Sequence, residues 1–274
     1  LQQQLLPAAR QSQEQMIAVD PVSKNLAELA TKVAQSDATV LLNGESGVGK
    51  EVLSQFIHQE STRNSGPFVA INCAAIPENM LEAALFGYEK GAFTGAIKST
   101  IGKFEQAQGG TLLLDEVSEM DLSLQAKLLR VIQERQVERL GSTKLIDLDV
   151  RIIATTNRDL KKEVADKRFR EDLFYRLNVF PLTVPALRSR PADIIPIAEK
   201  LIQLYSRAAG QKMLLSAEAS ALLLKHNWPG NVRELDNVIQ RALILKQGNE
   251  IKKDDIMLEM NVSIVGVSQN DEED

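Results

Sequence analysis

Five short runs of apolar residues recur along the first part of the chain, and segments with helical spacing lie between them. The runs cover residues 39–42, 68–71, 111–114, 150–156 and 179–184. The helical segments cover residues 21–34, 50–61, 76–86 and 122–136, with apolar side chains three or four positions apart. Apolar runs without polar alternation are typical of parallel strands that are buried on both faces. The pattern predicts an α/β fold with a mostly parallel five-stranded sheet flanked by helices.

The pattern changes after Pro185, where only helical spacing continues. Helices are predicted over residues 193–208, 216–225 and 231–246. Ser216 and Asn231 are placed to cap two of them. We therefore expect four parts in the chain. They are an N-terminal linker over 1–20, an α/β subdomain over 21–188, a small all-helical lid over 189–260, and a solvated C-terminal tail over 261–274.

Composition bounds the class of protein. Apolar residues make up 44% and charged residues 25% of the chain, as in ordinary soluble globular proteins, and no apolar stretch is long enough to span a bilayer. A net charge of −5 argues against a broad basic surface for nucleic acid. The single cysteine, Cys73, excludes an internal disulfide and suits a reducing cytoplasm. Cys73, His58 and His226 lack the spacing of metal ligands or of a nucleophile and its base, so we expect structural roles for them.

A glycine-rich turn follows the first apolar run and ends in a lysine at the start of a helical segment. Its residues are Gly44, Glu45, Ser46, Gly47, Val48, Gly49, Lys50 and Glu51. The glycines let the backbone turn its N–H groups inward, and together with the helix N-terminus they form a socket for an anion. The lysine can reach the terminal phosphates. The pattern G-x-x-x-x-G-K predicts a nucleotide-binding phosphate loop, although Glu51 stands where a Mg²⁺-binding Ser or Thr is usual.

Two carboxylates, Asp115 and Glu116, follow the most apolar of the five runs. Ligands of open α/β sheets bind at this end of the strands. Phosphoryl transfer to water needs a metal ion and an oriented water molecule beside the phosphates. We expect Asp115 to hold Mg²⁺, directly or through water, and Glu116 to polarise the attacking water as general base. A strand end that merely meets solvent is the alternative, and the acidic pair downstream of a phosphate loop argues against it.

Four further polar residues are candidates for contacts near the phosphates or for structural roles. Asn157, at another strand end, either binds the γ-phosphate or the water, or caps a turn. Arg170 and Arg176, six positions apart among apolar residues, are on spacing alone surface partners of the neighbouring acidic residues. Arg233, in the first turn of a predicted lid helix, either reaches the phosphates or pairs with Asp236 three residues on.

The stretch from residue 87 to 96 is rich in small residues and carries two aromatic side chains, Tyr88 and Phe93. Phe93 either anchors this loop to the core or is presented at a mobile tip. The glycines on both sides of Phe93 favour the tip, and we therefore expect a contact surface. Its residues are Gly91, Ala92, Phe93, Thr94, Gly95 and Ala96.

Four motifs occur together and in order, at residues 44–51, 91–96, 109–116 and 228–235. With them, the chain resembles the central AAA+ ATPase domain of bacterial enhancer-binding proteins, which activate sigma-54 RNA polymerase. The likeness covers roughly residues 20 to 260. The hexapeptide Gly-Ala-Phe-Thr-Gly-Ala at 91–96 is its most specific part. The whole chain is most similar to flagellar regulators.

The resemblance implies roles for residues around the phosphates. The family normally has Glu at the position of Glu51, so the missing hydroxyl does not argue against ATP binding. Asn72 matches the switch asparagine, which holds the catalytic glutamate, here Glu116, according to the nucleotide state. Thr156 and Asn157 fall on the motif called sensor I.

The resemblance also implies an assembly. Arg170 and Arg176 fall on the arginine fingers, which in the family act on the ATP of a neighbouring subunit, and Arg233 falls on sensor II. Fingers that act in trans imply a homo-oligomeric ring, which in this family is a hexamer or heptamer. The hexapeptide implies a loop whose Phe93 and Thr94 grip sigma-54.

The expected function is an ATP-hydrolysing machine that remodels the closed promoter complex of sigma-54 RNA polymerase into an open one, for flagellar genes and within a two-component system. The expected cofactors are ATP and Mg²⁺. Enhancer DNA is expected to be bound only through a domain absent from this chain, because no helix-turn-helix fits in residues 1–20 or 261–274. Two alternatives remain: a nucleotide-gated sigma-54-binding module with little turnover, and an AAA+ protein that acts on another protein or nucleic acid.

Overall fold

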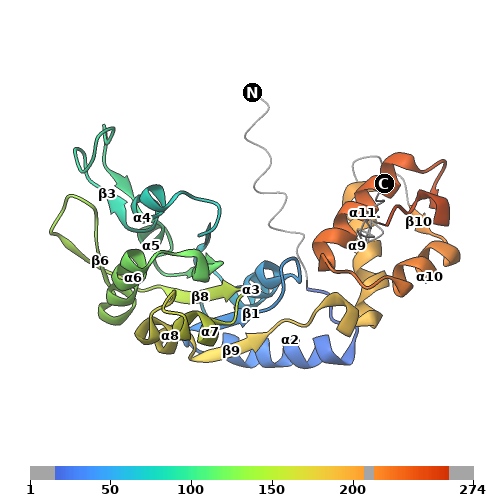
Figure 1. The fold of residues 1–274 in the computed structure, drawn as a ribbon, viewed down its shortest axis with the longest axis horizontal. Helices are drawn as coiled ribbons and strands as arrows, with labels where there is room; N and C mark the ends of the chain where they lie inside the picture. The colour runs from blue at the N-terminus through green and yellow to red at the C-terminus, as the bar shows by residue number, and fades with distance from the viewer. Residues whose placement is uncertain (1–15, 207–212, 259–274) are drawn as a thin grey trace, which may run out of the picture.

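A five-stranded parallel sheet forms the centre of the computed structural model, which describes residues 16–206 and 213–258 (Figure 1). The strand order is β2 (Phe68–Asn72), β5 (Thr111–Asp115), β8 (Arg151–Thr156), β1 (Val40–Asn43) and β9 (Phe180–Thr183). Every neighbouring pair is parallel. The prediction of five strands in a parallel sheet is confirmed, and each predicted run ends within one residue of the observed strand.

Both faces of the sheet are buried, which explains why its strands are almost continuously apolar. Leu112 and Leu114 of β5 belong to one hydrophobic core, while Leu113 between them belongs to the other. The first core contains side chains of α4 (Glu78–Phe86), α5 (Lys103–Gln106), α6 (Leu122–Glu134), α7 (Leu160–Ala165) and α8 (Glu171–Leu177). The second contains side chains of α2 (Pro21–Ala34) and α3 (Lys50–Gln59). The helices thus flank the sheet on both sides, as predicted.

Two small antiparallel hairpins extend from the sheet subdomain at the end away from the lid (Figure 1). One joins β3 (Gly87–Tyr88) to β4 (Thr100–Ile101), and the other joins β6 (Gln136–Glu138) to β7 (Leu145–Asp147). The helix predicted over residues 122–136 was too long at its C-terminal end, because Gln136 already belongs to the second hairpin. Arg135 adopts a left-handed backbone, with φ of 53°, and this ends α6 before β6 begins.

The lid contains α9 (Ile194–Ser206), α10 (Ala217–Lys225) and α11 (Asn231–Leu245) around a hydrophobic core of its own. A pair of two-residue strands, β10 (Leu214–Leu215) and β11 (Glu250–Ile251), adds a short parallel bridge to this otherwise helical unit. Ser216 caps α10 as expected, because its hydroxyl accepts a hydrogen bond from Ala219 N at 3.1 Å.

Asn231 does not cap α11, contrary to the sequence prediction. Gly230 occupies the cap position, and Asn231 is buried with a left-handed backbone, φ 54°. Its side-chain oxygen accepts a hydrogen bond from Leu187 N at 2.8 Å, and its amide donates to Glu45 and to the carbonyl of Ser46. Tertiary contacts with the phosphate loop therefore displace the local cap.

Asp193, fully buried just before α9, ties the start of α2 to the lid. One oxygen of its carboxylate accepts hydrogen bonds from the amides of Val19 (2.7 Å) and Asp20 (2.8 Å). The other accepts from the hydroxyl of Ser23. Asp20 in turn caps α2 by accepting from Val22 N at 3.1 Å. The expected linker and tail lie almost wholly in residues 1–15 and 259–274, outside the described residues. Within the described ranges, no helix is both long enough and apolar enough to cross a membrane.

Candidate nucleotide site and contact loop

The phosphate loop runs from the end of β1 to the first residue of α3, Lys50. Gly47 and Gly49 have φ of +76° and +101°, a conformation that a residue with a Cβ adopts only with strain. A Cβ built on Gly49 meets nothing within 4 Å, so open space lies beside the loop at the N-terminus of α3. The positive end of the helix dipole faces this space. The geometry is that of an anion socket.

Lys50 is buried to all but 6% and lies between the loop and the end of β5. Its ammonium donates to the carbonyl of Gly44 at 2.8 Å and to that of Glu45 at 3.3 Å. It also lies 3.4 Å from Oε1 of Glu116. One cation thus contacts both the phosphate loop and one of the two expected catalytic carboxylates.

Asp115 is held by two polar side chains from neighbouring strands. Thr155 of β8 donates its hydroxyl to Oδ1 at 2.6 Å, and Asn72 at the end of β2 donates its amide to Oδ2 at 2.8 Å. The hydroxyl oxygen of Thr155 also accepts from Glu116 N at 3.0 Å. Both hydrogen bonds orient the carboxylate at the C-terminal edge of the sheet, where ligands bind in this fold.

Asn72 contacts Asp115 rather than Glu116, the partner expected from the resemblance. Its amide oxygen accepts from the backbone N–H groups of Ala74 (2.9 Å) and Ala75 (3.0 Å), which fixes the direction of its amide nitrogen toward Asp115. Because Asn72 and Asp115 are direct partners in the β2–β5 register, the two side chains emerge side by side.

Glu116 has a left-handed backbone, with φ of 54°. Such a conformation costs roughly 1–3 kcal/mol in a non-glycine residue and is concentrated at functional sites. Its Oε2 accepts from Asn157 N at 3.1 Å, while Oε1 faces Lys50. The strained turn aims the carboxylate across the strand ends and toward the phosphate loop.

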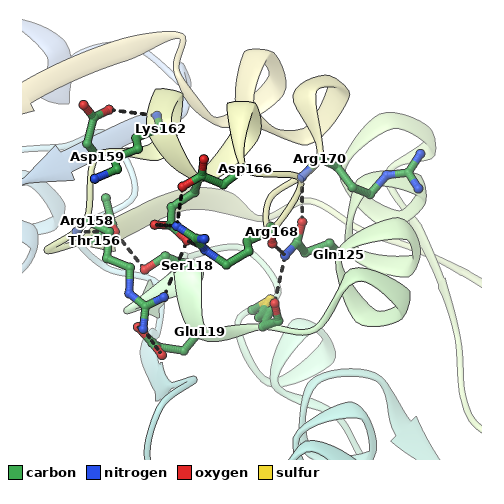
Figure 2. Close-up of polar contacts among 12 residues, drawn as sticks. Ser118, Glu119, Gln125, Thr156, Arg158, Asp159, Lys162, Asp166, Arg168 and Arg170 are labelled. Atoms are coloured by element: carbon green, nitrogen blue, oxygen red, sulfur yellow. Dashed lines mark hydrogen bonds and ion pairs between the residues drawn. The ribbon is translucent and has the colours of Figure 1, made fainter.

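Thr156, the other residue of the expected sensor, points away from these carboxylates. Its hydroxyl donates to Ser118 at 2.9 Å and accepts from Arg158 N at 3.0 Å (Figure 2). Ser118 belongs to η1 (Val117–Glu119), the short 3₁₀ turn that follows Glu116. Successive side chains of a strand face opposite ways, so it is Thr155 that faces Asp115, a residue that the sequence reasoning missed.

The lid lies against the phosphate loop. Arg233 donates to the hydroxyl of Ser46 at 2.7 Å, and its predicted rival partner, Asp236, is instead bonded to Tyr205. A Cβ on Gly47 would stand 2.6 Å from the carbonyl of Gly230, so the two backbones approach as closely as glycine allows. The lid therefore packs directly against the phosphate loop.

Arg188 strengthens that contact by pairing with Glu45 through both nitrogens, at 2.9 and 2.5 Å. This pairing, helped by the hydrogen bond from Asn231, lowers the pKa of the Glu45 carboxyl to about 2. Arg190, buried at the base of the lid, donates to the carbonyl of Val48 at 2.5 Å. Burial lowers the pKa of its guanidinium. Neither arginine was singled out from the sequence, since nothing local marks them.

Arg170 and Arg176 are exposed, one just before α8 and one near its C-terminal end, and the hydrogen bonds of their side chains go to Asp172 and to Ile132 O. Arg170 forms a two-nitrogen pair with Asp172, at 3.0 and 2.7 Å, which raises the pKa of the arginine. Arg176 donates to the carbonyl of Ile132 at 3.4 Å. The structure thus leaves both guanidinium groups on the surface, away from the other site residues.

The expected contact loop lies at the tip of the β3–β4 hairpin. Phe93 keeps 46% of its surface exposed and meets Tyr88 edge-on, with ring centroids 5.0 Å apart. Gly91 and Gly95 have φ of +83° and +103°, and Gly91 N donates to Ala96 O at 2.9 Å, which closes the loop. Phe93 is therefore not buried in the core, and it rests on one aromatic neighbour.

The cysteine and histidines lie apart from this chemistry. Cys73 is buried, and burial, followed by the charges of Asp115 and Glu116, raises the pKa of its thiol to about 12. His58 bonds Thr111 at 2.9 Å inside the sheet subdomain, and His226 bonds Glu234 at 2.7 Å in the lid. The described residues contain no group of three or more His, Cys, Asp or Glu side chains that could hold a metal ion.

Residues 16–183 match the sigma-54 interaction domain, and residues 188–271 match the AAA+ ATPase lid domain. The chain belongs to the sigma-54 interaction domain family. Among its relatives, response regulator protein FleR of Pseudomonas aeruginosa is 63% identical over 243 residues, which are 88% of this chain and 51% of FleR. Transcriptional regulatory protein FlbD of Caulobacter vibrioides is 53% identical over 250 residues, 91% of this chain and 55% of FlbD. The chain spans about half the length of these relatives.

Solved structures with similar coordinates agree with the fold described above. NtrX from Brucella abortus in complex with ADP aligns with a TM-score of 0.82 at 37% identity, over 91% of this chain and 56% of NtrX. NtrX in complex with ATP aligns with the same score at 36% identity and the same coverage. The parallel sheet with a following helical lid is therefore a fold that this chain shares with NtrX.

Proposed function

We propose that this member of the sigma-54 interaction domain family is an ATP-hydrolysing machine. The observation that carries the proposal is the position of Glu116, whose carboxylate lies 3.4 Å from the Lys50 ammonium and 3.1 Å from Asn157 N. A carboxylate in reach of the cation that binds the terminal phosphate is placed to orient and deprotonate an attacking water. A site that only binds nucleotide needs no such group.

The remaining residues divide the work. The backbone N–H groups of residues 44–51 and the Lys50 ammonium bind the phosphates, and Arg233 approaches them from the lid. Asp115 holds Mg²⁺, directly or through water; its two oxygens face Thr155 and Asn72 and keep lone pairs for a ligand. The ion would neutralise charge on the phosphates. The open space beside Gly49 lies on the side of the loop where the phosphates would bind.

Hydrolysis requires a second subunit in this proposal. The transition state of phosphoryl transfer gains from an arginine that enters the site, and Arg170 and Arg176 lie exposed on α8 rather than at the phosphate loop of their own chain. We therefore propose that they act in trans within a homo-oligomeric ring of six or seven copies. The NtrX complexes with ADP and ATP support nucleotide binding by this fold.

The hexapeptide loop is proposed to contact sigma-54. Phe93 is an exposed aromatic side chain between two glycines with left-handed backbones, on a hairpin remote from the lid. ATP turnover would move this loop and remodel the closed promoter complex. On the strength of the resemblance, we further propose that the whole protein is a cytoplasmic activator that binds enhancer DNA and acts on flagellar genes. We also propose that the chain divides into an α/β subdomain over 21–188 and a lid subdomain over 189–260.

The test is the specific ATPase rate measured against protein concentration, with the mass of the assembly measured in the same samples. We expect the rate per chain to rise as rings form. Glu116→Gln should keep ATP binding and nearly abolish turnover, while Glu60→Gln, an exposed glutamate beyond α3, should behave as wild type. ATP-dependent sigma-54 binding with no turnover above that of Glu116→Gln at any concentration would support the nucleotide-gated binding module instead.

A further inference from the structure

Gln125 is a fully buried polar side chain on α6, and its amide nitrogen and amide oxygen both make hydrogen bonds. Its nitrogen donates to the carbonyl of Met120 at 2.8 Å and to that of Arg168 at 3.1 Å. Its oxygen accepts from Arg170 N at 2.8 Å. Figure 2 shows Gln125 between the backbone before α8 and the turn that follows Glu116.

These bonds fix the backbone on both sides of Phe169. Phe169 is 2% exposed and anchored in the larger core of the sheet, and the residues flanking it each give one backbone group to Gln125. Arg170 is the residue that caps α8, and its own side chain makes no capping hydrogen bond. The backbone from which the Arg170 side chain projects is therefore held by a glutamine from another helix, while the guanidinium itself pairs with Asp172.

The same glutamine holds the end of the turn that carries the catalytic carboxylate. Met120 directly follows η1, whose Ser118 is bonded to Thr156 and whose Glu119 pairs with Arg158 at 2.7 Å. Glu116 begins that turn. The Gln125 side chain thus bonds the backbone at Met120, which follows the turn begun by Glu116, and the backbone at Arg170, the expected arginine finger.

We propose that Gln125 is a positioning residue for Arg170. By holding the backbone of Arg170, Gln125 keeps this arginine finger at the angle needed to enter the ATP site of the neighbouring subunit. The inference rests on the proposed function, because it requires Arg170 to act in trans. Its chemical basis is specific to an amide. An apolar side chain of the same length would fill the space and leave two carbonyls and one N–H without their partner.

The test uses mixed rings of the whole chain. Gln125→Met keeps the length of the side chain and removes the three hydrogen bonds. The pure variant should bind ATP as wild type does and turn over roughly 10- to 100-fold more slowly, since small misplacements of a catalytic group cost rates of this order. The variant Lys50→Ala has a disabled ATP site but an intact arginine finger, which can serve the intact site of a neighbouring Gln125→Met chain. The ATPase rate of the mixture should therefore be well above the sum of the rates of the two variants measured separately. Mixed with Arg170→Ala, Gln125→Met should show no such rise.

Two controls separate the possible failures. Leu128→Ala, a buried apolar truncation one turn along α6, lowers stability without touching the amide contacts and should retain the turnover of wild type below its melting temperature. Arg170→Ala mixed with Lys50→Ala should recover activity. If that pair recovers and the Gln125→Met pair does not, the inference about Gln125 is wrong. If neither pair recovers, fingers in trans are wrong, and the inference falls with the proposed function.

Discussion

Asn72 donates a hydrogen bond to Asp115, 2.8 Å away, although the two residues are 43 positions apart in the chain. The contact follows from the β2–β5 register, which pairs the last residues of both strands. Glu116, the next residue, is held instead by Lys50 and Asn157 N. The polar residues at the sheet edge therefore form two adjacent groups, one of Asn72 with Asp115 and one of Glu116 with Lys50 and Asn157 N.

Replacing Asn72 with alanine should uncouple nucleotide state from sigma-54 binding. The variant loses three hydrogen bonds, to Asp115, Ala74 N and Ala75 N, and because all three are exposed we expect a loss of stability of about 1–3 kcal/mol in total. Retention of sigma-54 should no longer differ between ADP and an analogue of the hydrolysis transition state. Asn64→Ala, an exposed asparagine in the loop before β2, is the matched control. Wild-type nucleotide dependence in Asn72→Ala would remove this residue from the switch.

Thr155→Val should slow ATP turnover without weakening ATP binding. The hydroxyl of Thr155 donates to Asp115 and accepts from Glu116 N, so valine, of nearly the same shape, removes the group that aligns both carboxylates. A hydrogen bond to a charged group contributes roughly 1.5–3 kcal/mol, which corresponds to about a 10- to 150-fold lower rate if the alignment is needed only in the transition state. Thr155→Ser keeps the hydroxyl and should keep most of the activity. Single-turnover kinetics of both variants would test this prediction. If Thr155→Val hydrolysed ATP as fast as Thr155→Ser, the Thr155 hydroxyl would have no role in aligning the carboxylates.

Phe93→Ala should leave ATP turnover within about twofold of wild type and abolish nucleotide-dependent sigma-54 retention, because a contact side chain on a remote hairpin does not shape the site. Ile97, 83% exposed in the same hairpin loop and outside the hexapeptide, provides the matched control as Ile97→Ala. Full sigma-54 retention by Phe93→Ala would assign the contact surface elsewhere.

The contact between Glu45 and Arg188 predicts a pH dependence with a defined sign. The folded pKa of Glu45, about 2, lies below its ordinary value of 4.5, so the pairing stabilises the folded chain fully above about pH 4.5 and loses its effect as the pH falls through about 2. Because the pair is exposed, we expect only roughly 0.2–1 kcal/mol. The difference in melting temperature between wild type and Glu45→Gln should shrink on acidification. A difference that is constant from pH 6 to pH 2.5 would contradict the pairing.

The sheet could be predicted from the sequence because burial on two faces leaves a local mark. A strand such as β5, with Leu113 in one core and its neighbours in the other, is apolar at three successive positions, and a run of this kind is visible without knowledge of its partners. The same holds for the phosphate loop, whose chemistry depends on residues adjacent in the chain. These features depend on short-range order alone.

Thr155, Arg188, Asn231 and Gln125 could not be found in this way. Each acts through a contact with a residue at least 40 positions away, such as Asp115 for Thr155 or Arg170 for Gln125. Which of two successive threonines faces the carboxylates depends on strand register, and a one-residue change of register would have exchanged Thr155 with Thr156. The cap predicted at Asn231 failed for the same reason, since tertiary partners outcompete a local bond.

The close approach of Gly47 and Gly230 bears on how this chain could be recombined with its relatives. Exchange of the lid alone would bring a foreign backbone within 2.6 Å of where a Cβ at position 47 would stand, and would replace Asn231 and Arg233 without their partners in residues 45–46. A chimera joined after β9 should therefore fold in two halves but bind ATP poorly. ATP binding should return only when the phosphate loop is exchanged together with the lid. The residues that must be exchanged together therefore come from two separate segments of the chain.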